Sequence, residues 1–231
     1  MNMSDRPIRL VLHPGHPKCG SSSIQHALRL NAAALAERGV FVPTRRPNRI
    51  FIQACERHDF APVEEWLLQL LTQVRQAGSD TLVISSENLG VRQLVTNGRP
   101  IHEIFARHCQ PVDVVYYIRR QDDWIVSMWQ QWGHKAGKSL TNYTEERLGF
   151  HEPVFRAAAH LFEDVYGGDR IAVVPLQRQA LVGGDLIVDF SHKTGVGPLL
   201  VEDDDRHKNP SMSGFLCDVL ARAPHVYDQA L

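Results

Sequence analysis

Short apolar runs alternate along the chain with segments whose apolar residues recur at helical spacing. Such runs, bounded by polar or glycine-containing segments, are typical of buried strands. They occupy Ile8–Leu12, Val40–Val42, Thr81–Ser85, Val112–Ile118 and Ile171–Leu176. Because strands that alternate with helices form mostly parallel sheets covered on both faces, the pattern predicts an α/β fold with a mostly parallel central sheet flanked by helices.

Segments of helical period fill most of the intervals between these runs. They cover Ser22–Arg38, Pro62–Ala77, Asp122–Ala136, Pro153–Tyr166 and Gly184–Thr194. Gly39, Gly78 and Gly195 follow three of these segments, as glycines commonly do at helix ends. Ser22 and Gln25 have the spacing of a capping box, so we expect the first of these helices to begin near Ser22.

The tryptophans fall mainly on the apolar faces of the predicted helices. Trp66 is expected on the apolar face of the Pro62–Ala77 helix. By spacing, Trp124, Trp129 and Trp132 are expected mainly in the core, although one of them that is off phase could stack on a sugar. The least patterned stretches are Pro43–Arg57 and Gly137–Glu152, and we interpret them as loops around a site.

Composition narrows the class of protein. The 231 residues are 43% hydrophobic and 22% charged, which fits one globular α/β domain, predicted over 1–231. The formal net charge of −1 gives no overall field toward nucleic acid or a membrane surface, so nucleic acid is not expected as a partner. Any anion site must therefore be a local cluster of side chains.

Cysteines and targeting signals point to the cytoplasm. The four cysteines are scattered without a Cys-x-x-Cys pair, which favours reduced thiols over a disulfide framework. No apolar segment has the length of a signal sequence or a membrane span, so we expect a cytoplasmic protein without an integral membrane segment. His13 and His16 lie close together, but their spacing fits no common zinc motif, and no metal is expected.

The segment HPGHPKCGSSSIQ joins the first strand to the first helix. Glycine-bearing loops in this position hold phosphate groups through backbone N–H groups and the positive end of the helix. A nucleotide triphosphate loop, GxxxxGK followed by Ser or Thr, would place its lysine directly after the second glycine. Here Ser21 follows Gly20, and the lysine of the loop is Lys18. The alternative is that the serines simply cap the helix.

A second cluster follows the strand Val112–Ile118. Arg119 stands at the predicted carboxyl end of this strand, and Ser127 lies one or two turns into the next helix. An arginine fork and a hydroxyl in this arrangement can bind one phosphate group. The alternative is a surface ion pair between Arg119 and Asp123.

Together the two motifs resemble the sulfotransferases that use 3′-phosphoadenosine 5′-phosphosulfate (PAPS). In that family a loop of the form Pro-Lys-x-Gly, followed by two Ser or Thr residues, holds the phosphosulfate, and a strand-end arginine with a serine eight residues later holds the 3′-phosphate. The matching loop residues are Lys18, Cys19, Gly20, Ser21, Ser22 and Ser23, and the matching pair is Arg119 and Ser127. The resemblance implies a P-loop nucleotide-kinase-like fold, PAPS as donor and 3′-phosphoadenosine 5′-phosphate (PAP) as product.

Weaker similarities extend the resemblance to the bacterial carbohydrate-type branch. The segment Ile84–Leu89 resembles the strand end that carries Ser-Ser-Glu there, Asp185–Val196 resembles the late helix, and Asn209–Ser213 resembles a C-terminal Asn-x-Ser-x-Ser segment. Two positions depart from the small-molecule sulfotransferases. Ser23 replaces an aromatic residue that stacks on adenine, and Gln121 replaces a proline. Both departures favour the carbohydrate-type branch and a carbohydrate or glycolipid acceptor.

Lys18 and Glu87 are the candidate catalytic residues. Lys18 would stabilise the charge on the leaving phosphate oxygen, and Glu87, just past a buried strand, would accept the proton of the acceptor hydroxyl. The family resemblance supports a glutamate in this role, while Glu87 could instead cap the next element. His16 and His134 are the alternative bases.

Two further basic clusters and two other functions stay open at this point. Arg206, His207 and Lys208 could add positive potential near the 3′-phosphate, and the arginines at 45, 46 and 49 could meet an anionic acceptor. The alternatives to a sulfotransferase are a P-loop nucleotide kinase or NTPase, and a non-catalytic member of the fold that binds nucleotide or glycan.

Overall fold

The computed structural model describes residues 6–44, 48–201 and 213–223. Its residues form two compact units, Met1–Ile118 with Val154–Val201, and Arg119–Pro153 with Glu202–Leu231. The single domain expected over 1–231 stays a prediction.

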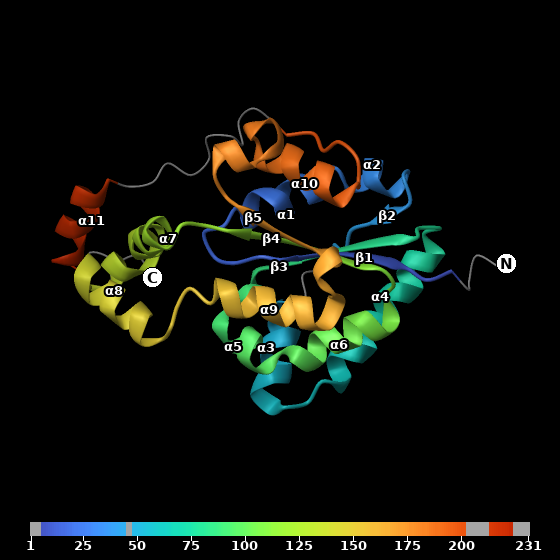
Figure 1. Cartoon of the computed structure of the whole chain (residues 1–231), viewed down its shortest axis with the longest axis horizontal. Helices are drawn as coiled ribbons and strands as arrows, with labels where there is room; N and C mark the ends of the chain where they lie inside the picture. The colour runs from blue at the N-terminus through green and yellow to red at the C-terminus, as the bar shows by residue number, and fades with distance from the viewer. Residues whose placement is uncertain (1–5, 45–47, 202–212, 224–231) are drawn as a thin grey trace. The chain divides into compact units, whose positions relative to one another are not determined.

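The first unit contains a five-stranded parallel sheet in the order β2-β3-β1-β4-β5 (Figure 1). The strands are β1 (Arg9–Pro14), β2 (Val40–Phe41), β3 (Thr81–Ser86), β4 (Val112–Ile118) and β5 (Ile171–Pro175). All five predicted strands are confirmed within two residues at each end. The fold is α/β and nucleotide-kinase-like, as predicted, with β1 in the middle of the sheet.

The register of β1 against β3 positions the site. Their pairs run from Arg9 with Thr81 to Pro14 with Ser86, so both strands end at the same level. The loops that follow them therefore begin side by side at the carboxyl edge of the sheet, where ligands collect in open α/β sheets. The residues of β1 and β3 that precede these loops belong to the buried core: Leu10, Val11, Leu12, Leu82 and Val83.

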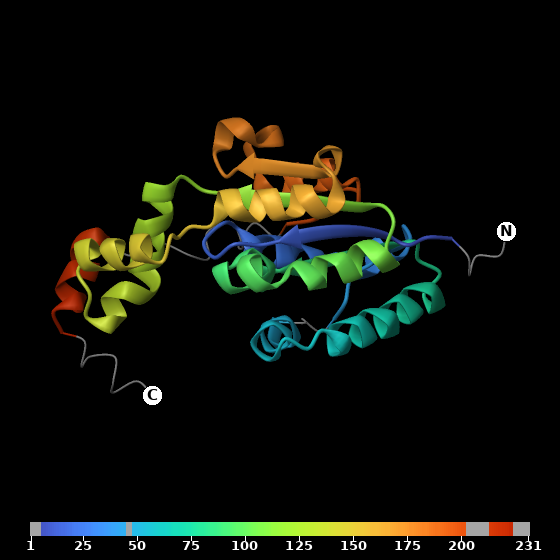
Figure 2. The same ribbon diagram turned by 60° about the horizontal axis from the view of Figure 1, so that its bottom comes forward.

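Helices cover both faces of this sheet (Figures 1 and 2). On one face lie α1 (Ser21–Leu30), α2 (Ala32–Ala36) and α10 (Leu186–Thr194). On the other lie α3 (Asn48–Arg57), α4 (Ala61–Gln76), α5 (Arg92–Asn97), α6 (Arg99–His108) and α9 (Phe155–Tyr166). This arrangement explains why β1, β3 and β4 read as nearly continuous apolar runs, since strands buried on both faces need no polar alternation.

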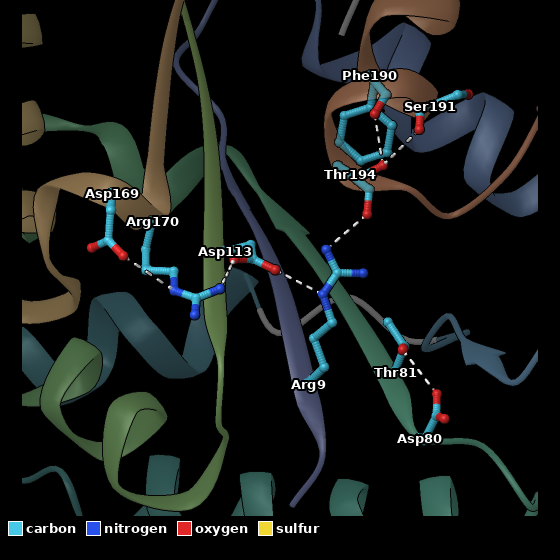
Figure 3. Close-up of polar contacts among 9 residues, drawn as sticks. All are labelled: Arg9, Asp80, Thr81, Asp113, Asp169, Arg170, Phe190, Ser191 and Thr194. Atoms are coloured by element: carbon cyan, nitrogen blue, oxygen red, sulfur yellow. Dashed lines mark hydrogen bonds and ion pairs between the residues drawn. The ribbon is translucent and has the colours of Figure 1, made fainter.

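A network of ion pairs lies at the amino-terminal ends of the strands (Figure 3). Asp113 on β4 accepts hydrogen bonds from Arg9 Nε at 2.7 Å and from Arg170 Nη1 at 3.2 Å. These bonds link β1, β4 and the start of β5. Arg9 also donates to the Thr194 carbonyl at 2.8 Å, at the negative C-terminal end of α10. This edge therefore has a structural role, and the opposite edge is left for a site.

The expected helix over Ser22–Arg38 is wrong in two respects. It is broken at Asn31, whose side-chain amide donates to Ala27 O at 2.8 Å and to Leu200 O at 2.9 Å, while its oxygen accepts Leu200 N–H. The side chain thus binds a distant segment at the point where the helix is interrupted. The capping box is also absent, because Gly20 occupies the N-cap position in a left-handed conformation and no side chain caps α1.

Two stretches interpreted as loops each contain a helix. Pro43–Arg57 includes α3, which is held by the buried residues Phe51, Ala54 and Cys55. Their spacing is helical, but the pattern is short and two of the residues are small. Gly137–Glu152 includes α8 (Leu140–Gly149), and the interval between β3 and β4 holds α5 and α6, for which no helix was predicted.

The second unit is a small helical cluster. It contains α7 (Gln121–Met128), a π-helical turn (Trp129–Gly133), a 3₁₀ turn (His134–Ala136), α8 and α11 (Gly214–Ala221). Its buried core is formed by Trp129, Tyr143 and Cys217, with Met128 and Leu140 packed against it.

The core position expected for Trp132 is wrong, because its side chain is 52% exposed. The physical reason is the π-helical turn that begins at Trp129. A π turn holds more residues than an α-helical one, so Trp132 rotates away from the face that Trp129 occupies.

The four cysteines are buried and free, which agrees with the prediction of reduced thiols. None of the helices within the described ranges is long and apolar enough to span a membrane. Across residues 6–44, 48–201 and 213–223, no group of three His, Cys, Asp or Glu side chains is placed to hold a metal ion.

Candidate functional site

The loop between β1 and α1 has an unusual backbone conformation. Lys18 has a φ of 63° and Gly20 a φ of 83°, so two of its residues lie in the left-handed region. Glycine enters this region without steric cost, whereas lysine does so at a cost in free energy. A non-glycine residue held in this way is often found at a functional site.

Close packing keeps the loop compact. A Cβ atom on Gly15 would lie 2.3 Å from Ser21 Oγ, and one on Gly90 would lie 2.4 Å from the Gly15 carbonyl oxygen. A Cβ on Gly20 would lie 2.4 Å from Leu186 Cδ2. The three glycines thus allow the loop to pack tightly against the turn after β3 and against α10.

The loop leads into a helix end suited to an anion. Ser21, Ser22 and Ser23 are the first residues of α1, and no acidic side chain lies in its first turn. N–H groups at the start of a helix have no partner within it, and they give this end a partial positive charge. Ser22 and Ser23 are exposed, whereas Ser21 is buried, so the site can offer amides, two exposed hydroxyls and the half-buried Lys18.

Glu87 lies directly beside this loop. β3 ends at Ser86, and Glu87 begins the following 3₁₀ turn, Glu87–Gly90. Gly15 N–H donates to the Ser86 carbonyl at 3.0 Å, and Glu87 Cα lies 3.3 Å from the position of a Cβ on Gly15. The structure therefore brings the loop and Glu87 together at one edge of the sheet, where the sequence analysis placed them.

His16 is a weak candidate for the base. It is buried, its ring lies edge-on to Phe155 with centroids 4.7 Å apart, and burial lowers its pKa to about 4. His13, below the loop, is also buried; its Nδ1 lies 2.8 Å from Ser85 Oγ and burial lowers its pKa to about 3. Both rings are therefore neutral packing groups at neutral pH.

Arg119 and Ser127 belong to the second unit. Arg119 is half-buried and follows the last residue of β4, and Ser127 is buried near the end of α7. The surface ion pairs are made by the next residue, because Arg120 bonds Asp122 and lies 4.0 Å from Asp123. The alternative pairing of Arg119 with Asp123 is thus replaced by one that involves Arg120.

His134 belongs to the same unit as Arg119 and Ser127. It is buried, and its Nδ1 lies 3.1 Å from the Trp129 carbonyl oxygen. This contact with the neighbouring π-helical turn indicates a packing role within the helical cluster.

Several basic residues and a C-terminal motif from the sequence analysis lie outside the described residues. These are Arg45, Arg46, Arg206, His207, Lys208 and Asn209, with the start of the motif that continues to Ser213. Arg49 is described, and it lies exposed on α3.

The structure also shows a pocket that the sequence analysis did not predict. It lies in the first unit, and Gln25, Arg29, Thr44, Trp66 and Ser85 are among the residues that line it. Trp66, expected on the apolar face of its helix, is half-buried and forms part of the pocket wall. The sequence signal for the pocket is Pro43, two residues after the end of the very short β2.

The chain thus contains a nucleotide-kinase-like α/β sheet. At the carboxyl ends of its strands, a glycine-containing loop precedes a helix N-terminus, and a carboxylate lies next to that loop. No protein-family model matches the chain, and no curated protein matches it. The site is therefore interpreted from its own residues and from the resemblance of its motifs to the PAPS-dependent sulfotransferases.

Proposed function

We propose that this protein is a PAPS-dependent sulfotransferase that transfers a sulfuryl group to a hydroxyl of a carbohydrate or glycolipid in the cytoplasm. One observation carries the proposal: Lys18 is held in a left-handed conformation in the middle of the loop, and Glu87 is packed against the same loop. The position of a triphosphate-loop lysine is taken by Ser21, whose buried side chain packs on Gly15. The loop thus favours a phosphosulfate over a triphosphate.

The roles follow from the chemistry of the transfer. The Glu87 carboxylate takes the proton of the acceptor hydroxyl, whose oxygen forms the new bond to sulfur. The bond between sulfur and the bridging oxygen breaks, and its electron pair leaves on the phosphate of PAP. Lys18 and the first amides and hydroxyls of α1 stabilise that negative charge. Because a sulfuryl group carries less charge than a phosphoryl group, this mechanism assigns no role to a metal ion.

Arg119 and Ser127 are proposed to bind the 3′-phosphate of the donor. The support for this part is the resemblance to the family motif, together with the position of Arg119 directly after β4. β4 neighbours β1, and the carboxyl ends of these parallel strands belong to one edge of the sheet.

A nucleotide kinase or NTPase is the second candidate, because the five-stranded parallel sheet flanked by helices is nucleotide-kinase-like. A kinase or NTPase differs from a sulfotransferase in its ligand, because it needs a nucleoside triphosphate with magnesium. A non-catalytic member of the fold would bind PAP but transfer no sulfate.

Thermal unfolding with nucleotides tests the donor class. PAP should raise the Tm without magnesium, whereas AMP and magnesium-ATP should raise it weakly or not at all. Arg119→Ala should remove most of the preference for PAP over AMP, since charged hydrogen bonds to a phosphate contribute on the order of 2–4 kcal/mol. The matched control is Arg120→Ala, a neighbouring exposed arginine that pairs with Asp122. Equal stabilisation by AMP and PAP would contradict the assignment, and stabilisation by magnesium-ATP alone would favour the kinase.

A further inference from the structure

The pocket exists because β2 is much shorter than the strand beside it. β2 ends at Phe41, while β3 continues to Ser86. Val40 and Phe41 pair with Thr81 and Leu82, and two residues later the chain reaches Pro43, which has no N–H to continue the ladder. The last part of β3 is thus left without a neighbouring strand on this side.

The uncovered edge of β3 presents backbone polar groups to the pocket. Thr81 N–H donates to Gly39 O at 3.1 Å, so Thr81 turns its backbone groups toward β2. Residues of a parallel strand alternate between its two neighbours, so Val83 and Ser85 turn the same way. Both line the pocket, where the Gln25 amide donates to the Ser85 carbonyl at the long distance of 3.5 Å.

The walls combine an aromatic ring with polar groups. The indole of Trp66 comes from α4 and is held edge-on by Phe51, with ring centroids 5.6 Å apart and planes at 87°. Gln25 and Arg29 come from α1, and the exposed hydroxyl of Thr44 comes from the segment after β2. The space enclosed by these walls is about 40 Å³ and opens to solvent, so a ligand packs against the walls from the open mouth and stays partly exposed.

This combination fits a sugar ring better than a flat or wholly apolar ligand. A pyranose has one face of C–H groups that packs on an indole, and a rim of hydroxyls that both donate and accept hydrogen bonds. These hydroxyls can form hydrogen bonds with the amide of Gln25, the hydroxyl of Thr44 and the free backbone groups along the edge of β3. The lining includes the cation Arg29, and none of the described residues that line the pocket is acidic.

We propose that the pocket binds an anionic pyranose unit of the acceptor, with its apolar face on Trp66 and its acidic group toward Arg29. The assignment to the acceptor rests on the proposed function. Ser85 in the pocket precedes Glu87 by two residues, a span of about 7 Å along an extended chain, which is close to the width of one sugar ring. Glu87 thus lies within one sugar residue of the pocket and next to the loop that contains Lys18.

Direct binding of two matched sugars tests the pocket without any donor. The probes are methyl β-D-glucuronide and methyl β-D-glucoside, which differ in a carboxylate, and binding is followed by ligand-observed NMR titration. The glucuronide should bind about two- to fivefold more tightly, which is the contribution of one partly exposed ion pair. Arg29→Gln should abolish this preference, and the Tm of the variant checks that it stays folded.

Two tryptophan variants locate the binding site. Trp66→Leu should weaken both sugars by about tenfold or more, whereas Trp132→Leu, at an exposed tryptophan of the second unit, should leave both unchanged. Sugar binding that is unaffected by Trp66→Leu and Arg29→Gln, or no sugar binding at all, would overturn the pocket assignment.

PAP binding to the same variants separates this inference from the proposed function. PAP should stabilise Trp66→Leu as much as the parent protein. If Trp66→Leu loses PAP binding but keeps sugar binding, the pocket would be the site for the adenine of the donor, and the inference would be overturned. Sugar binding with the predicted variant effects, but no PAP binding to any form, would support the pocket and contradict the sulfotransferase.

Discussion

The Cα atom of Glu87 lies 3.3 Å from the position that a Cβ atom on Gly15 would take. This closeness follows from the parallel register, because Pro14 and Ser86 are paired and each strand ends at that pair. The loop with Lys18 and the turn with Glu87 are therefore fixed to each other by backbone contacts. The sheet can thus hold Lys18, the cation for the leaving group, and Glu87, the carboxylate for the acceptor, in fixed relative positions.

Gly15→Ala should disturb this relationship. The new methyl group would meet Ser21 Oγ at 2.3 Å and the Glu87 backbone at 3.3 Å, so we expect a loss of about 1–3 kcal/mol in the free energy of unfolding. Urea unfolding measures it. Gly149→Ala is the matched control, since nothing lies within 4 Å of its added Cβ and its φ is not positive. Equal stability of the two variants would show that the loop does not pack as described.

Glu87→Gln should separate chemistry from donor binding. Glutamine keeps the shape of the side chain but cannot take a proton, so turnover should fall by roughly 10²–10⁴ while the Tm shift caused by PAP stays nearly unchanged. The assay uses labelled PAPS with a panel of glycans and glycolipids. Full activity on any acceptor found would place the base elsewhere, with His16 and His134 as the first residues to test.

Lys18→Gly and Lys18→Ala form a matched pair of variants. Both remove the ammonium group, so both should bind PAP less tightly and lose turnover. Their stabilities should differ, because glycine adopts the φ of 63° freely and alanine does not. We expect Lys18→Gly to be about 1 kcal/mol more stable than Lys18→Ala in urea unfolding. Unchanged PAP binding in both variants would exclude Lys18 from the donor site.

Much of the fold could be predicted because its signals are local. The buried strands appear as uninterrupted apolar runs, and the topology places their carboxyl ends at one edge. Lys18 and Glu87 could be assigned to the same edge for this reason. In contrast, α3 has only a short buried pattern at Phe51, Ala54 and Cys55, which local periodicity does not separate from a loop.

Other features depend on contacts that no local pattern contains. The helix break at Asn31 requires Leu200, far away in the sequence, as its partner. The exposure of Trp132 follows from a π-helical turn within an otherwise regular helical pattern. The pocket at Trp66 requires the early end of β2, and Pro43 is the local sequence signal for that end.

Buried histidines should make the protein less stable in mild acid. Burial lowers the pKa of His16 to about 4 and that of His13 to about 3, whereas an unfolded histidine has a pKa near 6.5. Between these values the unfolded chain binds protons that the folded chain does not, so the free energy of unfolding falls as the pH drops below about 6.5. For His16 alone the loss between pH 7 and pH 5 is about 2 kcal/mol.

Urea unfolding of His16→Leu at pH 7, 6 and 5 isolates this contribution. The variant should lose about 2 kcal/mol less than the parent protein between pH 7 and pH 5, whatever its stability at pH 7, because leucine has no proton to bind. The control is His160→Gln, at an exposed histidine on α9, which should keep the parent's pH dependence. If His16→Leu loses as much stability as the parent over this range, then His16 titrates in the folded protein. It would then regain its place as an alternative base to Glu87.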